Sequence, residues 1–268
     1  MKLWHQSFTV LDNVPAYQAV LEHEFRRLAA PGTEVVMHGM DPGTYLSAYP
    51  GEDIRYLYVQ GLHAQQILRN VRQAEREGYD GFMISTLPDA GLMEARTLVD
   101  IPVVGYGQSS MHVAAMSGHR FGIVCMIKEL APLYDANVRR YGLGGQFVGA
   151  YWLGLGFAEV SKGYEEPGPV LEALQAKVRE LSAQGIEVVI PGEAVLNAVI
   201  QKAGLRRIGD VPIVDGLAAT LKTAEMMVAL QQLTDLRHAR VSYFSRRPPE
   251  GRLDELDGYY FGPRSFAP

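Results

Sequence analysis

Short apolar runs along the chain alternate with longer stretches in which apolar residues recur every three or four positions. Short runs bounded by Gly and Pro are typical of buried strands, whereas the longer spacing indicates helices with one buried face. The predicted strands are 2–8, 34–38, 81–86, 103–106, 121–126, 146–150, 188–191 and 212–214. The predicted helices are 16–29, 63–77, 110–117, 130–141, 170–183 and 218–234. Strands that alternate with helices predict an α/β fold with parallel sheets.

The chain also carries an internal repeat. Residues 77–86 and 184–193 each contain a glycine at a helix end, then an acidic residue, then a buried strand, and their alignment places Thr86 on Glu193. Residues 14–17 match 131–134, and residues 100–105 match 210–215, in the same order along the chain. We interpret this as a duplication. It predicts two pseudo-symmetric parallel-sheet α/β halves that face each other across one cleft. The alternative is a single doubly wound domain with chance matches.

The repeat suggests a division of the chain. Residues 1–104 plus 213–235 would form the first α/β half, 105–212 the second half, and 236–268 a C-terminal extension. This extension is rich in arginine and aromatic residues and shows little periodicity. Such residues are enriched at interfaces, so we expect it to wrap its own domain or a neighbouring subunit. We favour the second possibility, a homo-oligomer.

The composition narrows the class of protein. The 268 residues are 47% hydrophobic and 21% charged, with a net charge of −5 and one cysteine. This balance is that of a soluble globular protein, and the negative charge argues against nucleic acid or a membrane as partner. One cysteine fits a reducing compartment, and the beginning of the chain lacks the pattern of a signal peptide. We therefore expect a cytoplasmic protein whose partner is a small-molecule substrate.

The predicted halves would bring Thr86 and Glu193 to either side of one cleft. Ligands of open parallel sheets bind beyond the carboxyl ends of the strands, where both residues lie. Each is followed by a turn into a helix, whose first N–H groups can hold a carboxylate. Such a cleft suits proton transfer at one carbon and needs no metal and no organic cofactor. The histidines have no tight metal-ligand spacing, and the glycine pairs lack the order of a dinucleotide site.

Several segments of the chain resemble a known family. They are residues 80–92, 101–105 with 108–112, 120–124, 185–192 and 212–216. On these segments the chain resembles the aspartate/glutamate/hydantoin racemase superfamily, which includes maleate isomerase and arylmalonate decarboxylase. The hydantoin racemase branch looks most similar. The resemblance implies a cofactor-independent enzyme that acts on a small carboxylate or a cyclic amide such as a hydantoin.

The chain departs from this family at the two catalytic positions. Two-base racemases of the family carry a cysteine at each of the two strand ends, where this chain has Thr86 and Glu193. The only cysteine, Cys125, lies in the predicted strand 121–126. The two-thiol mechanism therefore does not carry over. A threonine hydroxyl has no accessible anion near neutral pH, whereas a buried glutamate can be a general base.

We therefore hypothesise an isomerase of racemase type in which Glu193 is the general base and Thr86 a hydrogen-bonding group. Two alternatives stay open: a one-base lyase (decarboxylase) or hydrolase, and a catalytically inactive small-molecule binding protein. Structural roles are also open, because Glu193 and Thr86 can each serve only as a helix cap.

Further residues are candidates for substrate binding. Gln6 and Ser7 end the first strand, at the position where the resembling family binds substrate. Gln108 and Ser109 belong to a predicted N-cap cluster at 107–110, and His112 follows in the same helix. Cys125 either lines the cleft or is a buried core residue. Asp215 could cap the last helix or orient a substrate group, and we favour the cap. Residues 152–157 could form a pocket wall, a lid or surface packing. The predicted substrate-binding residues are thus Gln6, Ser7, Gln108, Ser109, His112 and Cys125.

Overall fold

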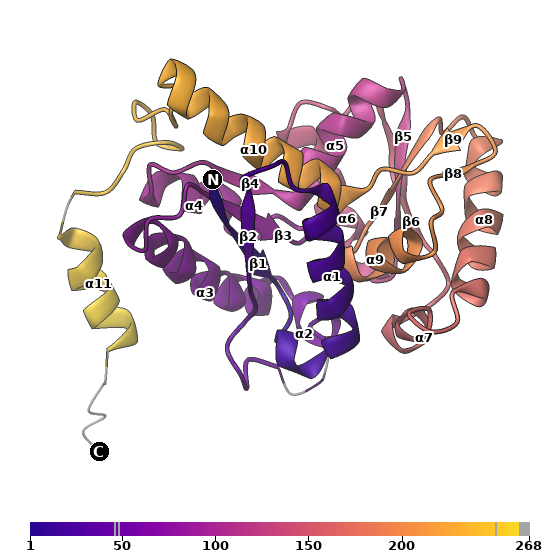
Figure 1. The fold of residues 1–268 in the computed structure, drawn as a ribbon, viewed down its shortest axis with the longest axis horizontal. Coiled ribbons are helices and arrows are strands. Elements are labelled where there is room, and N and C mark those ends of the chain that lie inside the picture. Colours follow the sequence, from indigo (N-terminus) through magenta and orange to yellow (C-terminus); the bar gives the residue numbers. More distant parts are fainter. Residues whose placement is uncertain (46, 48, 250, 263–268) are drawn as a thin grey trace.

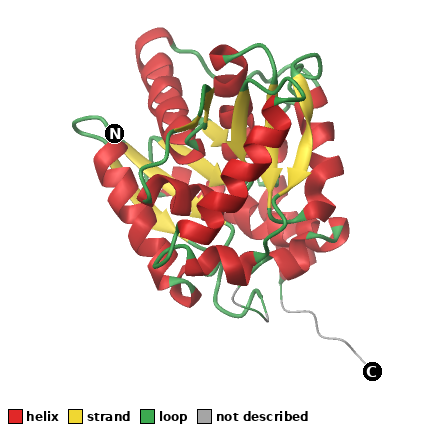
Figure 2. Cartoon of the chain, turned by 90° about the vertical axis from the view of Figure 1, so that its right-hand side faces the viewer, coloured by secondary structure: helices red, strands yellow, loops and turns green. Residues whose placement is uncertain are grey.

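The protein consists of two parallel sheets covered by helices, as predicted (Figure 1). The computed structural model describes residues 1–45, 47, 49–249 and 251–262. The two sheets lie next to each other with helices around both, and no sheet spans the whole molecule (Figure 2). The α/β fold class expected from the alternation of strands and helices is therefore confirmed.

The first sheet has four parallel strands in the order β2-β1-β3-β4. The strands are β1 (Lys2–Ser7), β2 (Glu34–His38), β3 (Gly81–Ser85) and β4 (Val103–Gly105). The helices in this part of the chain are α1 (Pro15–Leu28), α2 (Gly51–Ile54), α3 (Leu57–Arg76) and α4 (Leu92–Leu98), preceded by the 3-10 turn η1 (Leu11–Asn13).

The second sheet has three parallel strands in the order β6-β5-β7. The strands are β5 (Phe121–Cys125), β6 (Phe147–Trp152) and β7 (Val188–Pro191). The helices of this part are α5 (Tyr106–Ser117), α6 (Ala131–Arg140), α7 (Phe157–Lys162), α8 (Gly168–Ser182) and α9 (Ala194–Lys202), with the turn η2 (Lys128–Leu130). β8 (Arg207–Ile208) and β9 (Val211–Pro212) form a small antiparallel pair.

The two sheets repeat one strand order. Ile213 forms a parallel bridge with Val189 of β7. It therefore takes the place beside β7 that β4 takes beside β3 in the first sheet. The chain then returns as α10 (Gly216–Thr234), which packs against α5, α1, β3 and β4. β3, β5 and β7 are buried at every position, as parallel strands covered on both faces require. This matched order supports our reading of the sequence repeat.

Several helices were not foreseen. Short helices such as α2 and α7 are too short to show a clear period. α5 begins at Tyr106, four residues before the predicted start, because an acceptor from another loop caps it. The extension, whose sequence shows little periodicity, contains one further helix, α11 (Arg252–Phe261). Within the described residues, no helix is both long and apolar enough to cross a membrane.

The extension is attached to its own chain by arginine side chains. Arg240 donates to the Val99 carbonyl oxygen at 2.6 Å and pairs with Asp100 at 2.9 Å. Arg247 also pairs with Asp100, at 2.6 Å. Arg72 of α3 pairs with Asp254 and Asp257 of α11. The first of our two expectations, contact with its own domain, thus describes these residues, and the homo-oligomer stays a prediction.

Candidate active site

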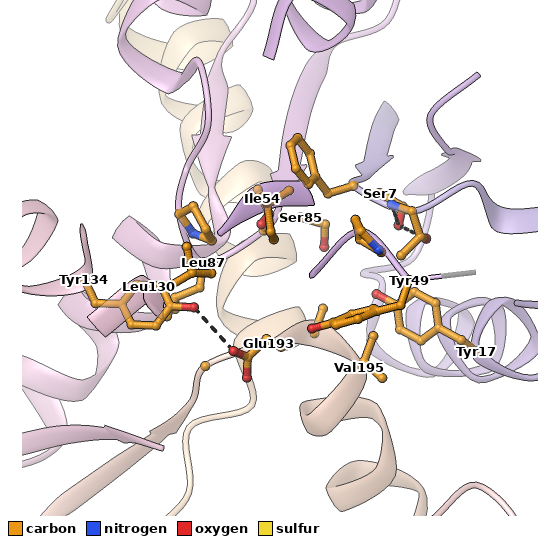
Figure 3. A pocket seen from close by; sticks show the side chains of 17 residues that line it. Ser7, Tyr17, Tyr49, Ile54, Ser85, Leu87, Leu130, Tyr134, Glu193 and Val195 are labelled. Carbon is orange, nitrogen blue, oxygen red and sulfur yellow. Dashed lines mark hydrogen bonds between the residues drawn. The ribbon is translucent and has the colours of Figure 1, made fainter. Parts of the chain in front are cut away.

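A small cavity lies at the carboxyl ends of strands from both sheets. Its lining comes from the segments after β1, β3 and β7, from the chain after β5, and from α1 and α2 with the residues before α2 (Figure 3). The lining residues are Ser7, Phe8, Thr9, Tyr17, Tyr49, Pro50, Ile54, Ser85, Thr86, Leu87, Pro88, Leu130, Tyr134, Gly192, Glu193, Ala194 and Val195. Thr86 and Glu193, which the repeat aligns, therefore face one cavity.

Among the described residues that line the cavity, Glu193 carries the only carboxylate. Its side chain accepts hydrogen bonds from the Met126 N–H at 2.9 Å, the Ile127 N–H at 3.3 Å and the Tyr134 hydroxyl at 3.4 Å. Burial raises the pKa of Glu193 to about 7, although these three donors favour the anion and oppose the rise. Near neutral pH the group can therefore both accept and release a proton.

The capping role that we left open for Glu193 is wrong. Glu193 occupies the N-cap position of α9, but its side chain makes no capping hydrogen bond to that helix. The carboxylate turns instead to the backbone N–H groups that follow β5. The Glu193 side chain, which follows β7, is thus held inside the cavity by the backbone that follows the neighbouring strand β5.

Two hydroxyl groups at the end of β3 line the same cavity. The Ser85 hydroxyl is buried and has no hydrogen-bond partner among the described residues. Thr86 is 8% exposed and lines the cavity beside it. A buried hydroxyl without a partner is unfavourable in a folded protein, so these groups are suited to hydrogen bonds with a ligand.

Two tyrosines occupy equivalent places in the two halves. Tyr17 near the start of α1 and Tyr134 in α6 both line the cavity, and they correspond in the sequence match of 14–17 with 131–134. Burial raises the pKa of both hydroxyls far above the ordinary value, so both stay protonated. The sequence analysis missed them as site residues. The repeat that ends in these tyrosines is the signal that marks them.

Asp89 was also missed, although it lies in the loop that carries Thr86. Its carboxylate accepts from the Gly107 N–H at 2.9 Å, the Gln108 N–H at 2.7 Å and the Tyr141 hydroxyl at 2.6 Å. Burial raises the pKa of Asp89 to about 7 against these donors. Because Asp89 supplies the acceptor at the start of α5, the predicted N-cap cluster at 107–110 is wrong: these residues lie inside the helix.

The other predicted binding residues lie outside the cavity lining that the structure describes. Gln6 is buried and held by Trp4, Asn70 and the Gly39 carbonyl oxygen. On α5, the Gln108 side chain accepts from Arg96, Ser109 is packed in the core, and the His112 ring faces outward and contacts the Gln108 carbonyl oxygen. Of the predicted substrate-binding residues, the cavity contains Ser7, whose hydroxyl lies 2.7 Å from that of Thr9.

Cys125 is fully buried at the end of β5 and packs against Gly192. A side chain at Gly192 would begin 2.9 Å from the Cys125 Cβ, so the two strand ends touch here. Burial raises the pKa of the Cys125 thiol well above its usual range. The thiol is therefore protonated near neutral pH and does not line the cavity, which favours the core role over the cleft role. Asp215 caps α10 through the Leu217 and Ala218 N–H groups, as expected.

Comparison with known proteins agrees with this fold. A family described as Asp/Glu/Hydantoin racemase matches residues 16–224. A hydantoin racemase from Pseudomonas sp. (strain NS671) is 28% identical over 220 residues, which cover 80% of this chain and 82% of that protein. An allantoin racemase structure from Klebsiella pneumoniae has a TM-score of 0.77 at 23% identity and covers 93% of this chain and 94% of its own.

A second allantoin racemase structure, from Pseudomonas fluorescens, has a TM-score of 0.72 at 22% identity and covers 93% of this chain and 98% of its own. At this identity the structural likeness establishes the fold, and the family match covers most of the chain. The chain belongs to the Asp/Glu/hydantoin racemase family.

Proposed function

We propose that the protein inverts the configuration of a hydantoin-like cyclic amide, or of a small carboxylate, at the carbon next to a carbonyl group. The observation that carries the proposal is Glu193, a carboxylate with a pKa of about 7 in a cavity between the strand ends of two sheets. A general base works best when its pKa lies near the working pH. The hydantoin racemase relatives support the cyclic amide as substrate.

The reaction uses one base supplied by the protein, together with water. The Glu193 carboxylate removes the proton from the acidic carbon, and the electron pair of the broken C–H bond forms an enolate with the neighbouring carbonyl. Glu193 can return the proton and restore the original configuration. A water held by the Thr86 hydroxyl can instead deliver a proton to the opposite face and leave hydroxide. The protonated Glu193 then neutralises that hydroxide, which restores the enzyme.

Exchange with heavy water tests this proposal. A single enantiomer of a 5-substituted hydantoin is incubated in D2O, and we expect loss of optical rotation together with deuterium at the reacting carbon. Substitution E193Q should reduce both rates by about 10³-fold, within the range expected for loss of a general base. E172Q on the exposed face of α8 is the matched control and should behave as the wild type.

The pH dependence supplies a second readout. Because Glu193 must be ionised to accept a proton, kcat/KM should rise with pH and level off above about 7. Release of carbon dioxide, or ring opening, in place of exchange would assign the site to a decarboxylase or hydrolase and overturn the proposal. Binding without turnover of hydantoins or small carboxylates would indicate an inactive binding protein.

A further inference from the structure

Tyr49 presents a hydroxyl to the cavity that the reaction above does not use. The hydroxyl oxygen is buried and has no hydrogen-bond partner among the described residues. The residue lies just before α2 and lines the cavity together with Glu193. Figure 3 shows the hydroxyl end of Tyr49 directed toward the Glu193 carboxylate, from the side opposite Tyr134. A buried hydroxyl without a partner destabilises a fold, so its position points to a ligand that completes it.

Two features hold the Tyr49 ring in this position. The ring stacks on Phe157 at the start of α7, with centroids 4.0 Å apart and an interplanar angle of 6°. Gly51 leaves room for the ring, because a Cβ at that position would lie 2.1 Å from Tyr49 Cε1. Phe157 lies between β6 and β7 of the second sheet in the chain, whereas Tyr49 lies in the part that forms the first sheet. The hydroxyl is therefore directed into the cavity by contacts from both parts of the molecule.

The hydroxyl is suited to donate a hydrogen bond and unsuited to act as a base. Burial raises the pKa of Tyr49 well above its ordinary value, and the nearby Glu193 raises it further. Electrostatic interactions with Tyr164, Tyr17 and Cys125 also raise the pKa of Tyr49. Tyr49 thus keeps its proton over the pH range in which Glu193 gains and loses one.

We propose that Tyr49 is a catalytic residue that donates a hydrogen bond to the carbonyl oxygen of the substrate while Glu193 removes the neighbouring proton. This rests on the proposed function. As the C–H bond breaks, its electron pair forms the carbon–carbon double bond of the enolate, and the carbonyl π pair moves onto the oxygen. The Tyr49 O–H bond stays intact. A donor already in place where charge develops lowers the barrier without reorganisation.

The substitution Y49F tests this inference. It keeps the ring that stacks on Phe157 and removes only the hydroxyl. We expect kcat for hydantoin racemisation to fall by about 10²-fold, as for loss of one donor to a developing oxyanion. KM should change by less than about 3-fold, because the interaction strengthens mainly in the transition state. The rise of kcat/KM near pH 7 should persist, since Glu193 is retained.

Y79F is the matched control. Tyr79 is equally a buried tyrosine of the first part of the chain but packs on Trp4, away from the cavity, so its substitution should leave kcat unchanged. G51A gives a second test, because the added methyl displaces the Tyr49 ring and should lower kcat in the same direction as Y49F.

The outcomes separate the two proposals. If the wild type racemises hydantoins and Y49F keeps kcat within about 3-fold of the wild-type value, the role of Tyr49 is overturned and the proposed function stands. A loss of kcat in Y49F that is matched by a lowered melting temperature assigns Tyr49 a structural role and also overturns it. A wild-type protein that exchanges no deuterium overturns the proposed function and the role of Tyr49 together.

Discussion

At Glu193, burial and hydrogen bonding act on the pKa in opposite directions. The N–H groups after β5 and the Tyr134 hydroxyl stabilise the anion, while removal from water disfavours it more strongly. The folded-state pKa of about 7 lies above the ordinary 4.5. A raised carboxyl pKa means that the contribution of this group to stability is complete below about pH 4.5 and is lost as the pH rises through about 7.

This sign predicts a pH-dependent effect of E193Q on stability. The amide cannot ionise, so the free energy of unfolding of E193Q relative to the wild type should increase between pH 5 and pH 8. The increase should reach about 3 kcal/mol at most, because a pKa that differs by one between the folded and unfolded states corresponds to about 1.4 kcal/mol. Urea unfolding at four pH values measures it, with E172Q as control. If the difference in unfolding free energy between E193Q and the wild type does not vary with pH, the pKa of Glu193 is not raised in the folded protein.

The loop between β3 and α4 illustrates how one element positions the site. It carries Thr86 and Leu87 into the cavity and is held by two contacts just beyond them. Asp89 binds the start of α5 and Tyr141, and the Asn137 side chain donates to the Pro88 carbonyl oxygen at 2.9 Å. Asp89 itself has a φ of 52°, a conformation that Asp and Asn tolerate better than most residues.

Substitution D89A should therefore destabilise the protein and impair the site. It removes the acceptor of two backbone N–H groups and one hydroxyl and places Ala in a left-handed conformation, so we expect a loss of about 2–3 kcal/mol. Activity should fall as well, because the Thr86 loop loses its anchor. Thermal unfolding and racemisation rates check both effects. D89N, which tolerates the same φ and keeps an acceptor, should lose less; equal losses would contradict this explanation.

At the scale of the whole molecule, two sheets of the same strand order share one cavity, and the extension is attached to α3 and to the residues at the end of α4. Its aromatic residues Tyr243 and Phe244 are 90% and 69% exposed, while Arg240 and Arg247 fix the segment to Asp100. Exposed aromatic and arginine residues are enriched at interfaces between subunits. The proposed homo-oligomer would bury this surface.

Light scattering on the purified protein tests this proposal. We expect the wild type to be a homo-oligomer and the double substitution R240A/R247A to reduce its mean mass, because the extension loses its fixed position. K177A, which removes an exposed ion pair on α8, should leave the mass unchanged. A monomeric wild type would rule out the extension as a subunit interface.

Local pattern in the sequence was enough to predict most of the strands, the longer helices and the alignment of Thr86 with Glu193. Strand periodicity and a duplicated segment are recorded in residue order, so they can be read without coordinates. The same signal would have marked Tyr17 and Tyr134. It could not exclude Gln6, Gln108, Ser109, His112 or Cys125 from the cavity, since each lies at a strand end or in the helix that follows one.

Only the tertiary structure decided which groups meet and in what state of protonation. The unpartnered hydroxyls of Tyr49 and Ser85, the turn of Glu193 toward the end of β5, and the capping of α5 by Asp89 all depend on contacts between segments far apart in the chain. Burial and hydrogen bonding are properties of such contacts. A residue pattern therefore determines where a side chain enters the fold, and the packed neighbours determine what it can do there.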